Sequence, residues 1–159
     1  MAKKPAIPLD SFDQRILSAL QRDGRMRLAD LSEAVGLSAT PCARRVAKLE
    51  AAGVITGYSA RVDQELLGLP LNIFIFVELE HQTRDAVNTF EAAMKRFDQV
   101  MECYLMTGTR DILLRVVAED LPDFDRFLED RLMRVPGIRN TRSSFTLRTM
   151  IRRDALPAC

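Results

Sequence analysis

The chain lacks several residue types on which whole classes of function depend. It has 159 residues, no tryptophan and a single histidine, His81, so a multi-histidine metal site is excluded. Its three cysteines are odd in number and include no C-x-x-C pair (Cys42, Cys103 and Cys159), which indicates reduced thiols rather than a disulfide framework. No apolar run is long enough for a transmembrane helix, and the first ten residues lack the apolar core of a secretory signal. We therefore expect a cytoplasmic protein with no membrane partner.

Charge is divided unevenly along the chain, although the formal net charge is only +1. Residues 1–62 carry ten Lys and Arg against six Asp and Glu, whereas residues 63–159 carry thirteen against sixteen. A basic first part and an acidic second part suggest a module that binds a polyanion, joined to a different domain. Ordinary scatter of surface charge explains the same counts equally well, so the charge division alone does not establish a polyanion-binding module.

The first third of the sequence has the spacing of three short helices. Apolar residues recur at helical intervals in three stretches, each followed by a glycine that can end a helix: Gly24, Gly36 and Gly53. Asp10 is the expected N-cap of the first helix, and Ser38 or Thr40 that of the third. Two helices joined by a tight turn, after a supporting helix, are typical of a helix-turn-helix motif. The β-prone segment 55–62 could form a short strand pair, or wing.

The rest of the sequence alternates between strand and helix patterns. Strands are expected at 71–80, 100–107, 111–118 and 138–151, with helical spacing after the first strand and again after Asp120. The order β-α-β-β-α-β is that of the ferredoxin-like fold. The sequence thus predicts an α+β protein with a winged helix-turn-helix domain at 1–62, a linker at 63–70, a ferredoxin-like domain at 71–153 and a tail at 154–159.

The ferredoxin-like fold places both helices on one face of its sheet, so the other face must be covered in another way. We expect Phe74, Phe76, Tyr104 and Phe145 on that open face. A monomer would expose these aromatic rings to water as a large patch. Pairing of two chains through their open faces is therefore the expected arrangement.

The third helix carries the strongest candidate for a nucleic-acid contact. Arg44, Arg45 and Lys48 are expected to point away from its apolar face, where Arg and Lys can reach guanine or phosphate in the major groove. Ser38 and Thr40, at its start, can hold a phosphate through hydroxyls and free amides. A solvated charged face is the alternative explanation. Together with the helix-turn-helix spacing, the pattern favours binding of double-stranded DNA.

Four stretches of the sequence resemble the Lrp/AsnC (feast/famine) family of transcriptional regulators, especially its leucine-responsive branch. They are LDSFDQRILSALQRDGR, VGLSATPCARRVAKLEAAGVITGYSA, ECYLMTGTRDILLRV and RVPGIRNTR, and the resemblance extends from Leu9 to about Arg153. It implies a winged helix-turn-helix joined to a ligand-binding domain called RAM, in dimers that often assemble further into octamers. The DNA contacts that it implies are Ser38, Thr40, Pro41, Arg44, Arg45 and Lys48.

The resemblance also implies a site for a small amino-acid effector between two paired RAM domains. Gly108 and Asp111 match the family's G-x-x-D motif: amides around Gly108 would hold the ligand's carboxylate, and Asp111 its ammonium group. Ile112 stands where the family usually has tyrosine, and a plain hairpin turn is the alternative explanation of the motif. The implied effector residues, which include two apolar side chains and three hydroxyls near the turn, are Leu105, Thr107, Gly108, Asp111, Met133, Ser144 and Thr146.

Two other functions fit parts of the sequence. Haem-pathway decarboxylases share this two-domain architecture, but a tetrapyrrole site is expected to need several basic and histidine side chains, and only His81 is available. A DNA-organising protein with little sequence discrimination would use the same groove-reading helix. The sequence therefore predicts a cytoplasmic, nucleoid-associated regulator that is not an enzyme. Its expected partners are double-stranded DNA, other copies of itself and a small amino acid, with no metal or cofactor.

Overall fold

The computed structural model describes residues 8–157, a range that leaves out Cys159. Contacts divide the chain into two compact units. The first comprises the described residues up to Arg61 together with the described residues from Ile151 onward, and the second comprises Val62–Met150. Each unit has its own hydrophobic core. No helix in the described range is long and apolar enough to cross a membrane.

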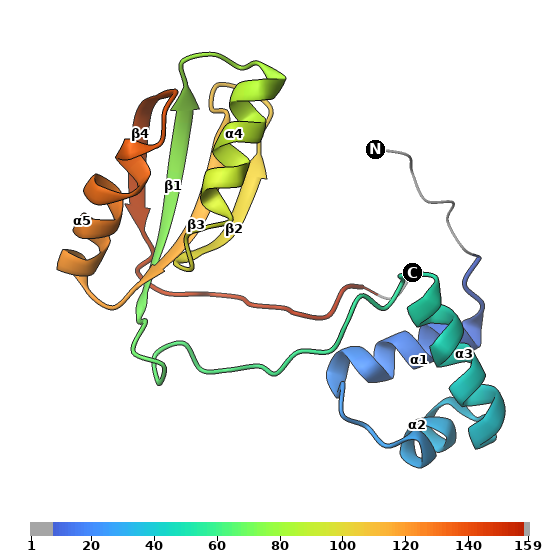
Figure 1. The fold of residues 1–159 in the computed structure, drawn as a ribbon. Coiled ribbons are helices and arrows are strands. Elements are labelled where there is room, and N and C mark those ends of the chain that lie inside the picture. The colour runs from blue at the N-terminus through green and yellow to red at the C-terminus, as the bar shows by residue number, and fades with distance from the viewer. Residues whose placement is uncertain (1–7, 158–159) are drawn as a thin grey trace. The chain divides into compact units, whose positions relative to one another are not determined.

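Three helices make up the core of the first unit: α1 (Ser11–Arg22), α2 (Leu28–Val35) and α3 (Ala39–Ala51) (Figure 1). They meet at a small cluster of buried side chains: Ile16, Leu31, Val35, Cys42 and Leu49. Gly36 ends α2 in the left-handed conformation, with φ of 73°, which glycine adopts at little cost. The tight turn that follows leads directly into α3. The helix-turn-helix prediction is confirmed.

A reciprocal capping box fixes the start of α1. The carboxylate of Asp10 accepts hydrogen bonds from the backbone amides of Phe12 and Asp13, at 2.9 and 3.0 Å. In return, the carboxylate of Asp13 accepts one from the amide of Asp10 at 3.3 Å. Amides in the first turn of a helix have no acceptor within the helix. The two aspartates therefore satisfy donors that would otherwise need water.

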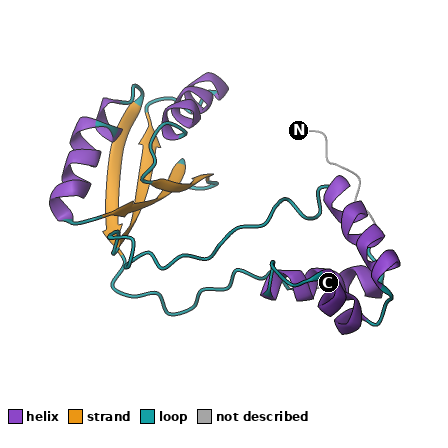
Figure 2. Ribbon diagram, turned by 60° about the horizontal axis from the view of Figure 1, so that its bottom comes forward, coloured by secondary structure: helices purple, strands orange, loops and turns teal. Residues whose placement is uncertain are grey.

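The segment after α3 does not form the wing that the sequence suggested. Residues 55–62 contain no strand and are drawn as loop in Figure 2. The hydroxyl of Tyr58 instead donates to Glu50 of α3 at 2.9 Å. Its ring also lies close to Gly24, where a β-carbon would stand 3.4 Å from the ring. A short β-prone stretch needs a partner strand to become a strand itself, and here its side chains contact helices.

The described end of the chain packs with the first unit. The backbone amide of Leu156 donates to the side-chain oxygen of Gln21 in α1 at 2.6 Å. Arg61 forms an ion pair with Asp154 at 3.3 Å. The last strand ends at Phe145, earlier than the expected 138–151, and the described residues from Ile151 onward cluster with the first unit instead of the sheet.

The second unit is a four-stranded antiparallel sheet with two α-helices. In chain order its elements are β1 (Leu71–Leu79), α4 (Arg84–Met94), β2 (Val100–Leu105), β3 (Ile112–Ala118), α5 (Leu121–Asp130), the 3-10 helix η1 (Leu132–Arg134) and β4 (Ile138–Phe145). The strands are arranged β2-β3-β1-β4. This arrangement confirms the α+β class and the ferredoxin-like order of elements.

Both helices cover the same face of the sheet (Figure 1). Alternate residues of β1 from Ile73 to Leu79 share one buried cluster with Phe90 of α4 and Phe124 of α5. Phe145 also belongs to this face, because it pairs with Ile73 and its ring packs edge-on against Phe124, with centroids 5.3 Å apart. The prediction that Phe145 lies on the open face is therefore wrong.

The open face of the sheet keeps the other expected aromatic residues. Phe74 and Phe76 of β1 lie on it, and so do Tyr104 and Leu113, which pair with each other across β2 and β3. The guanidinium carbon of Arg110 lies 5.0 Å from the ring centroid of Phe76. The open face thus consists of four large side chains on the side of the sheet away from the helices: Phe74, Phe76, Tyr104 and Leu113.

Candidate DNA-binding and effector sites

The N-terminus of α3 is exposed and offers free backbone donors. Ser38 is the N-cap, Thr40 and Pro41 lie in the first turn, and the side chain of Ser38 makes no capping bond within the described part of the chain. The first intrahelical amide is that of Cys42, which donates to the carbonyl of Ser38 at 3.1 Å. The amides of Ala39 and Thr40 are therefore free at the positive end of the helix dipole, an arrangement suited to a phosphate, whereas Pro41 has no N–H to donate.

Arg44 and Lys48 lie one turn apart on the exposed side of α3. No residue in the range 8–157 forms an ion pair with either of them. Their positive charges are thus not neutralised by neighbouring side chains. Side chains separated by four residues project from the same side of a helix, so the two cations can act together on one groove or backbone.

Arg45 points toward α1 instead, which corrects the expectation that it faces away from the packed side. Its Nη1 atom donates to Asp10 at 2.8 Å and to Asp13 at 2.7 Å. The side chain of Arg45 is 29% exposed and that of Asp13 only 6%. The reason is helical geometry: Arg45 lies three residues after Cys42 and four before Leu49, both buried, and so borders the apolar side.

This bridge changes the electrostatics at the start of α1. Hydrogen bonds from the Asp13 amide and from Arg45 hold the pKa of Asp10 below its ordinary value of 3.8. The hydrogen bonds to Asp13 and Asp10 also raise the pKa of Arg45. Both effects favour the charged forms that make the bridge.

The turn between β2 and β3 is organised by Asp111. Its carboxylate is buried and accepts hydrogen bonds from the backbone amide of Leu79 at 2.7 Å and from the side-chain amide of Gln82 at 2.5 Å. Its carbonyl accepts from the amide of Met106 at 2.8 Å. Gly108 lies at the exposed tip with φ of 109°, where a side chain would be strained. Asp111 therefore joins the turn to the end of β1.

The seven expected effector residues do not form one cluster within the second unit. Leu105, Thr107 and Gly108 lie in or beside the β2–β3 turn, close to Asp111. Ser144 belongs to β4, on the opposite edge of the sheet. The expectation that the hydroxyls of Ser144 and Thr146 lie near this turn is therefore wrong within a single chain, because β3 and β1 separate β4 from β2.

The two groups also lie at opposite ends of β1. The amide of Thr146 donates to the carbonyl of Asn72 near the start of β1, whereas Asp111 bonds to Leu79 at its end. Met133, in η1, accepts a hydrogen bond from the hydroxyl of Thr141 in β4 at 3.7 Å. Seven residues spread in this way could share a ligand only with help from a second copy of the domain.

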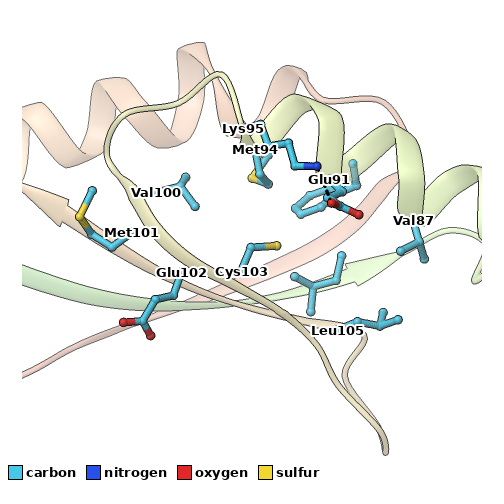
Figure 3. A pocket seen from close by; sticks show the side chains of 11 residues that line it. Val87, Glu91, Met94, Lys95, Val100, Met101, Glu102, Cys103 and Leu105 are labelled. Carbon is cyan, nitrogen blue, oxygen red and sulfur yellow. Dashed lines mark ion pairs between the residues drawn. The ribbon is translucent and has the colours of Figure 1, made fainter. Parts of the chain in front are cut away.

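A groove of about 470 Å³ lies between α4 and β2. Its walls include Phe90, Met94, Leu105 and Ile112, and Cys103 points into it from β2 (Figure 3). An ion pair between Glu91 and Lys95, 2.6 Å long, lies at its rim. Burial raises the pKa of the Cys103 thiol, with a further contribution from Glu91, so the thiol is kept in its unreactive form.

Sequence reasoning did not find this groove, since its apolar residues have the spacing of an ordinary core. Leu105 is the residue that the groove shares with the expected effector set. Among the described residues, no group of His, Cys, Asp and Glu is arranged to hold a metal ion.

Two family models match the chain. Residues 9–50 match the AsnC-type helix-turn-helix domain, and residues 72–156 match the Lrp/AsnC ligand binding domain. The Bkd operon transcriptional regulator of Pseudomonas aeruginosa is 44% identical over 94% of this chain and 97% of its own. The leucine-responsive regulatory protein of Escherichia coli K12 is 37% identical over 89% of this chain and 86% of its own.

Solved structures agree with these matches. A transcriptional regulator of Neisseria meningitidis, solved as an L-Met complex, has a TM-score of 0.90 and 36% identity, covering 94% of this chain and 97% of that one. The feast or famine regulatory protein of M. tuberculosis, complexed with L-methionine, has a TM-score of 0.82 and 31% identity, covering 91% and 96%. These relatives are transcriptional regulators and not decarboxylases. The chain belongs to the Lrp/AsnC family of transcriptional regulators.

Proposed function

We propose that this protein regulates transcription by binding double-stranded DNA through α3, in the cytoplasm and on the nucleoid. The observation that carries the proposal is the pair Arg44 and Lys48, which are exposed, one turn apart and free of ion pairs within the described residues, beside the open N-terminus of α3. Ser38, Thr40 and Pro41 would contact the phosphate backbone there. The two cations would contact base edges in the major groove or the phosphates that border it.

The salt dependence of binding tests this assignment. A labelled duplex, selected from a randomised library by the wild-type protein, is titrated at several salt concentrations with R44A, K48A and the double variant. Each lost phosphate contact should make the slope of log affinity against log salt shallower by about 0.9. R126A is the matched control, since it removes an exposed arginine from α5 in the other unit. Wild-type affinity and slope in the double variant would refute the proposal.

The same titration separates specific regulation from general DNA organisation. At one fixed salt concentration, the affinity for the selected duplex is compared with that for a scrambled duplex of equal length. A sequence-specific regulator is expected to prefer the selected duplex by about a thousandfold or more. A ratio near one would favour the low-specificity alternative.

We further propose a small amino acid as the effector, bound beside the β2–β3 turn. Three features support this. The tip at Gly108 is exposed with its backbone accessible, Asp111 supplies a carboxylate, and Leu105 opens onto the apolar groove beside α4. Related regulators have been solved with L-methionine, which fits an apolar effector. Thermal-shift measurements against the twenty amino acids test this, because a ligand that binds only the folded state raises its stability.

We propose that the protein works as a dimer that assembles further, up to an octamer, with open faces paired. The open face places four large side chains of one unit on the uncovered side of the sheet. Ser144 and Thr146 of one copy could then approach the turn of another, which would complete the effector set that a single chain leaves apart. Light scattering at micromolar concentration tests the assembly; a particle of 18.0 kDa, the mass of one chain, would refute it.

A further inference from the structure

Arg45 connects two helices through a single nitrogen atom. Nη1 donates to carboxylates from both members of the α1 capping box, Asp10 and Asp13, and the guanidinium carbon lies 5.3 Å from the ring centroid of Phe12. Asp13 is nearly fully buried. The side chain of Arg45 is therefore held at its charged end by groups that cap α1, and these groups are themselves fixed by backbone hydrogen bonds.

The position of Arg45 on α3 separates it from the two exposed cations. Arg45 is adjacent to the buried side of the helix, whereas Arg44 and Lys48 lie on the exposed side. Its positive charge is also more than offset locally, since two carboxylates face one guanidinium. A neutralised cation adds little to the attraction of phosphate, because the field of the pair largely cancels at a distance.

We propose that Arg45 is a positioning residue that sets the orientation of α3 relative to α1 and does not itself contact DNA. This rests on the proposed function of α3. Arg45 joins the start of α1 to the middle of α3, so loss of the bridge lets α3 rotate or tilt against α1. Arg44 and Lys48 would then meet the groove at the wrong angle, and binding would weaken although both contacts remain in the chain.

Three variants in the full-length protein test the inference: R45Q, D13N and the double variant D13N/R45Q. Glutamine removes the charge of Arg45, and asparagine removes the charge of Asp13 while it can still accept the amide of Asp10. Binding to the selected duplex is measured at a temperature at which circular dichroism shows each variant fully folded. A merely stabilising role predicts wild-type affinity under these conditions.

The expected result is a loss of roughly tenfold in affinity for both single variants, about 1.4 kcal/mol, with the salt slope unchanged. The affinity of the double variant should be no lower than that of the single variant that binds DNA less tightly, because both changes break the same bridge. D13N carries the test alone if R45Q fails to fold.

Wild-type affinity in folded D13N would overturn the inference. If R45Q at the same time shows a slope of log affinity against log salt that is shallower by about 0.9, Arg45 contacts a phosphate instead. The R44A/K48A variant distinguishes failure of this inference from failure of the proposed function of α3. If that variant also binds like wild type, α3 is not the DNA-binding element, whereas a defect there with unaffected D13N rejects only the role of Arg45.

Discussion

The carboxylate of Asp111 and the backbone amide of Leu79 lie 2.7 Å apart and tie the β2–β3 turn to the end of β1. Gln82, just beyond β1, donates to the second carboxylate oxygen. The residue expected to hold the ammonium group of an effector is thus already part of the framework of its own domain. A carboxylate has about four acceptor positions, so structural and ligand-binding use are compatible.

Asp111→Ala should therefore weaken the domain as well as its response to amino acids. We expect the free energy of unfolding of the second unit to fall by about 1–3 kcal/mol, because the amide of Leu79 loses a buried charged acceptor. The chain has two tyrosines, so Tyr104 alone reports on the second unit in a Y58F background during urea unfolding. Gln82→Ala is the control: Gln82 is exposed and its loss leaves the Leu79 bond intact. Equal stability of both variants would contradict this account.

Phe76→Asp should split the dimer. Phe76 lies on the open face beneath Arg110. Burying a carboxylate between two such faces costs more in lost hydration than an ion pair with Arg110 returns. Light scattering should show a monomer for this variant. Asn88→Asp, which adds the same charge to an exposed position of α4, should leave the particle unchanged. A wild-type particle mass for both variants would exclude the open face as the interface.

Thr146→Val should raise the stability of the ligand-free protein. Among the described residues, the buried hydroxyl oxygen of Thr146 has no hydrogen-bond partner. Valine has nearly the same shape and removes an unsatisfied polar atom, so a gain of about 1 kcal/mol is expected. Urea unfolding followed through Tyr104 measures it. If the hydroxyl serves the effector, the variant gains stability and loses the amino-acid response; lower stability without ligand would show that the hydroxyl already has a partner.

Asp10→Asn should destabilise the first unit at neutral pH but not in acid. The pKa of Asp10 is depressed in the folded state, so its charge contributes stability that is present above pH 3.8 and is lost as the pH falls through the lower folded value. Asparagine remains a good N-cap, which isolates the charge. Unfolding is followed through Tyr58 in a Y104F background from pH 7 to pH 2. A difference between wild type and variant that does not shrink below pH 3.8 would rule out this source of stability.

Local patterns predicted most of the fold. Helical spacing, the Asp10 cap and the glycine after α2 placed the first three helices, and alternation placed β1. Phe145 was assigned to the wrong face because its orientation depends on its pairing with Ile73, which is distant in sequence. A one-residue shift in register reverses the face of every side chain in a strand.

The candidate sites were harder to predict than the fold, for the same reason. Arg45 has the sequence context of an exposed cation, and its partners Asp10 and Asp13 come from another helix. The aspartate pair of the capping box was visible in the sequence, and a cation at the edge of the apolar side of α3 was the available signal. Ser144 was grouped with Leu105 because strand order, which places β3 and β1 between them, is not encoded in local spacing.

The pairing of β1 with β4 has a consequence for synthesis of the chain. β1 is the first strand to leave the ribosome and β4 the last, yet they are neighbours, with Ile73 opposite Phe145. The three helices of the first unit make mainly short-range contacts and can fold while translation continues, whereas the sheet must wait for nearly the whole chain. Until then one edge of β1 has no partner strand. A nascent chain stalled before β4 should therefore carry a folded helix-turn-helix and an incomplete sheet that protease removes.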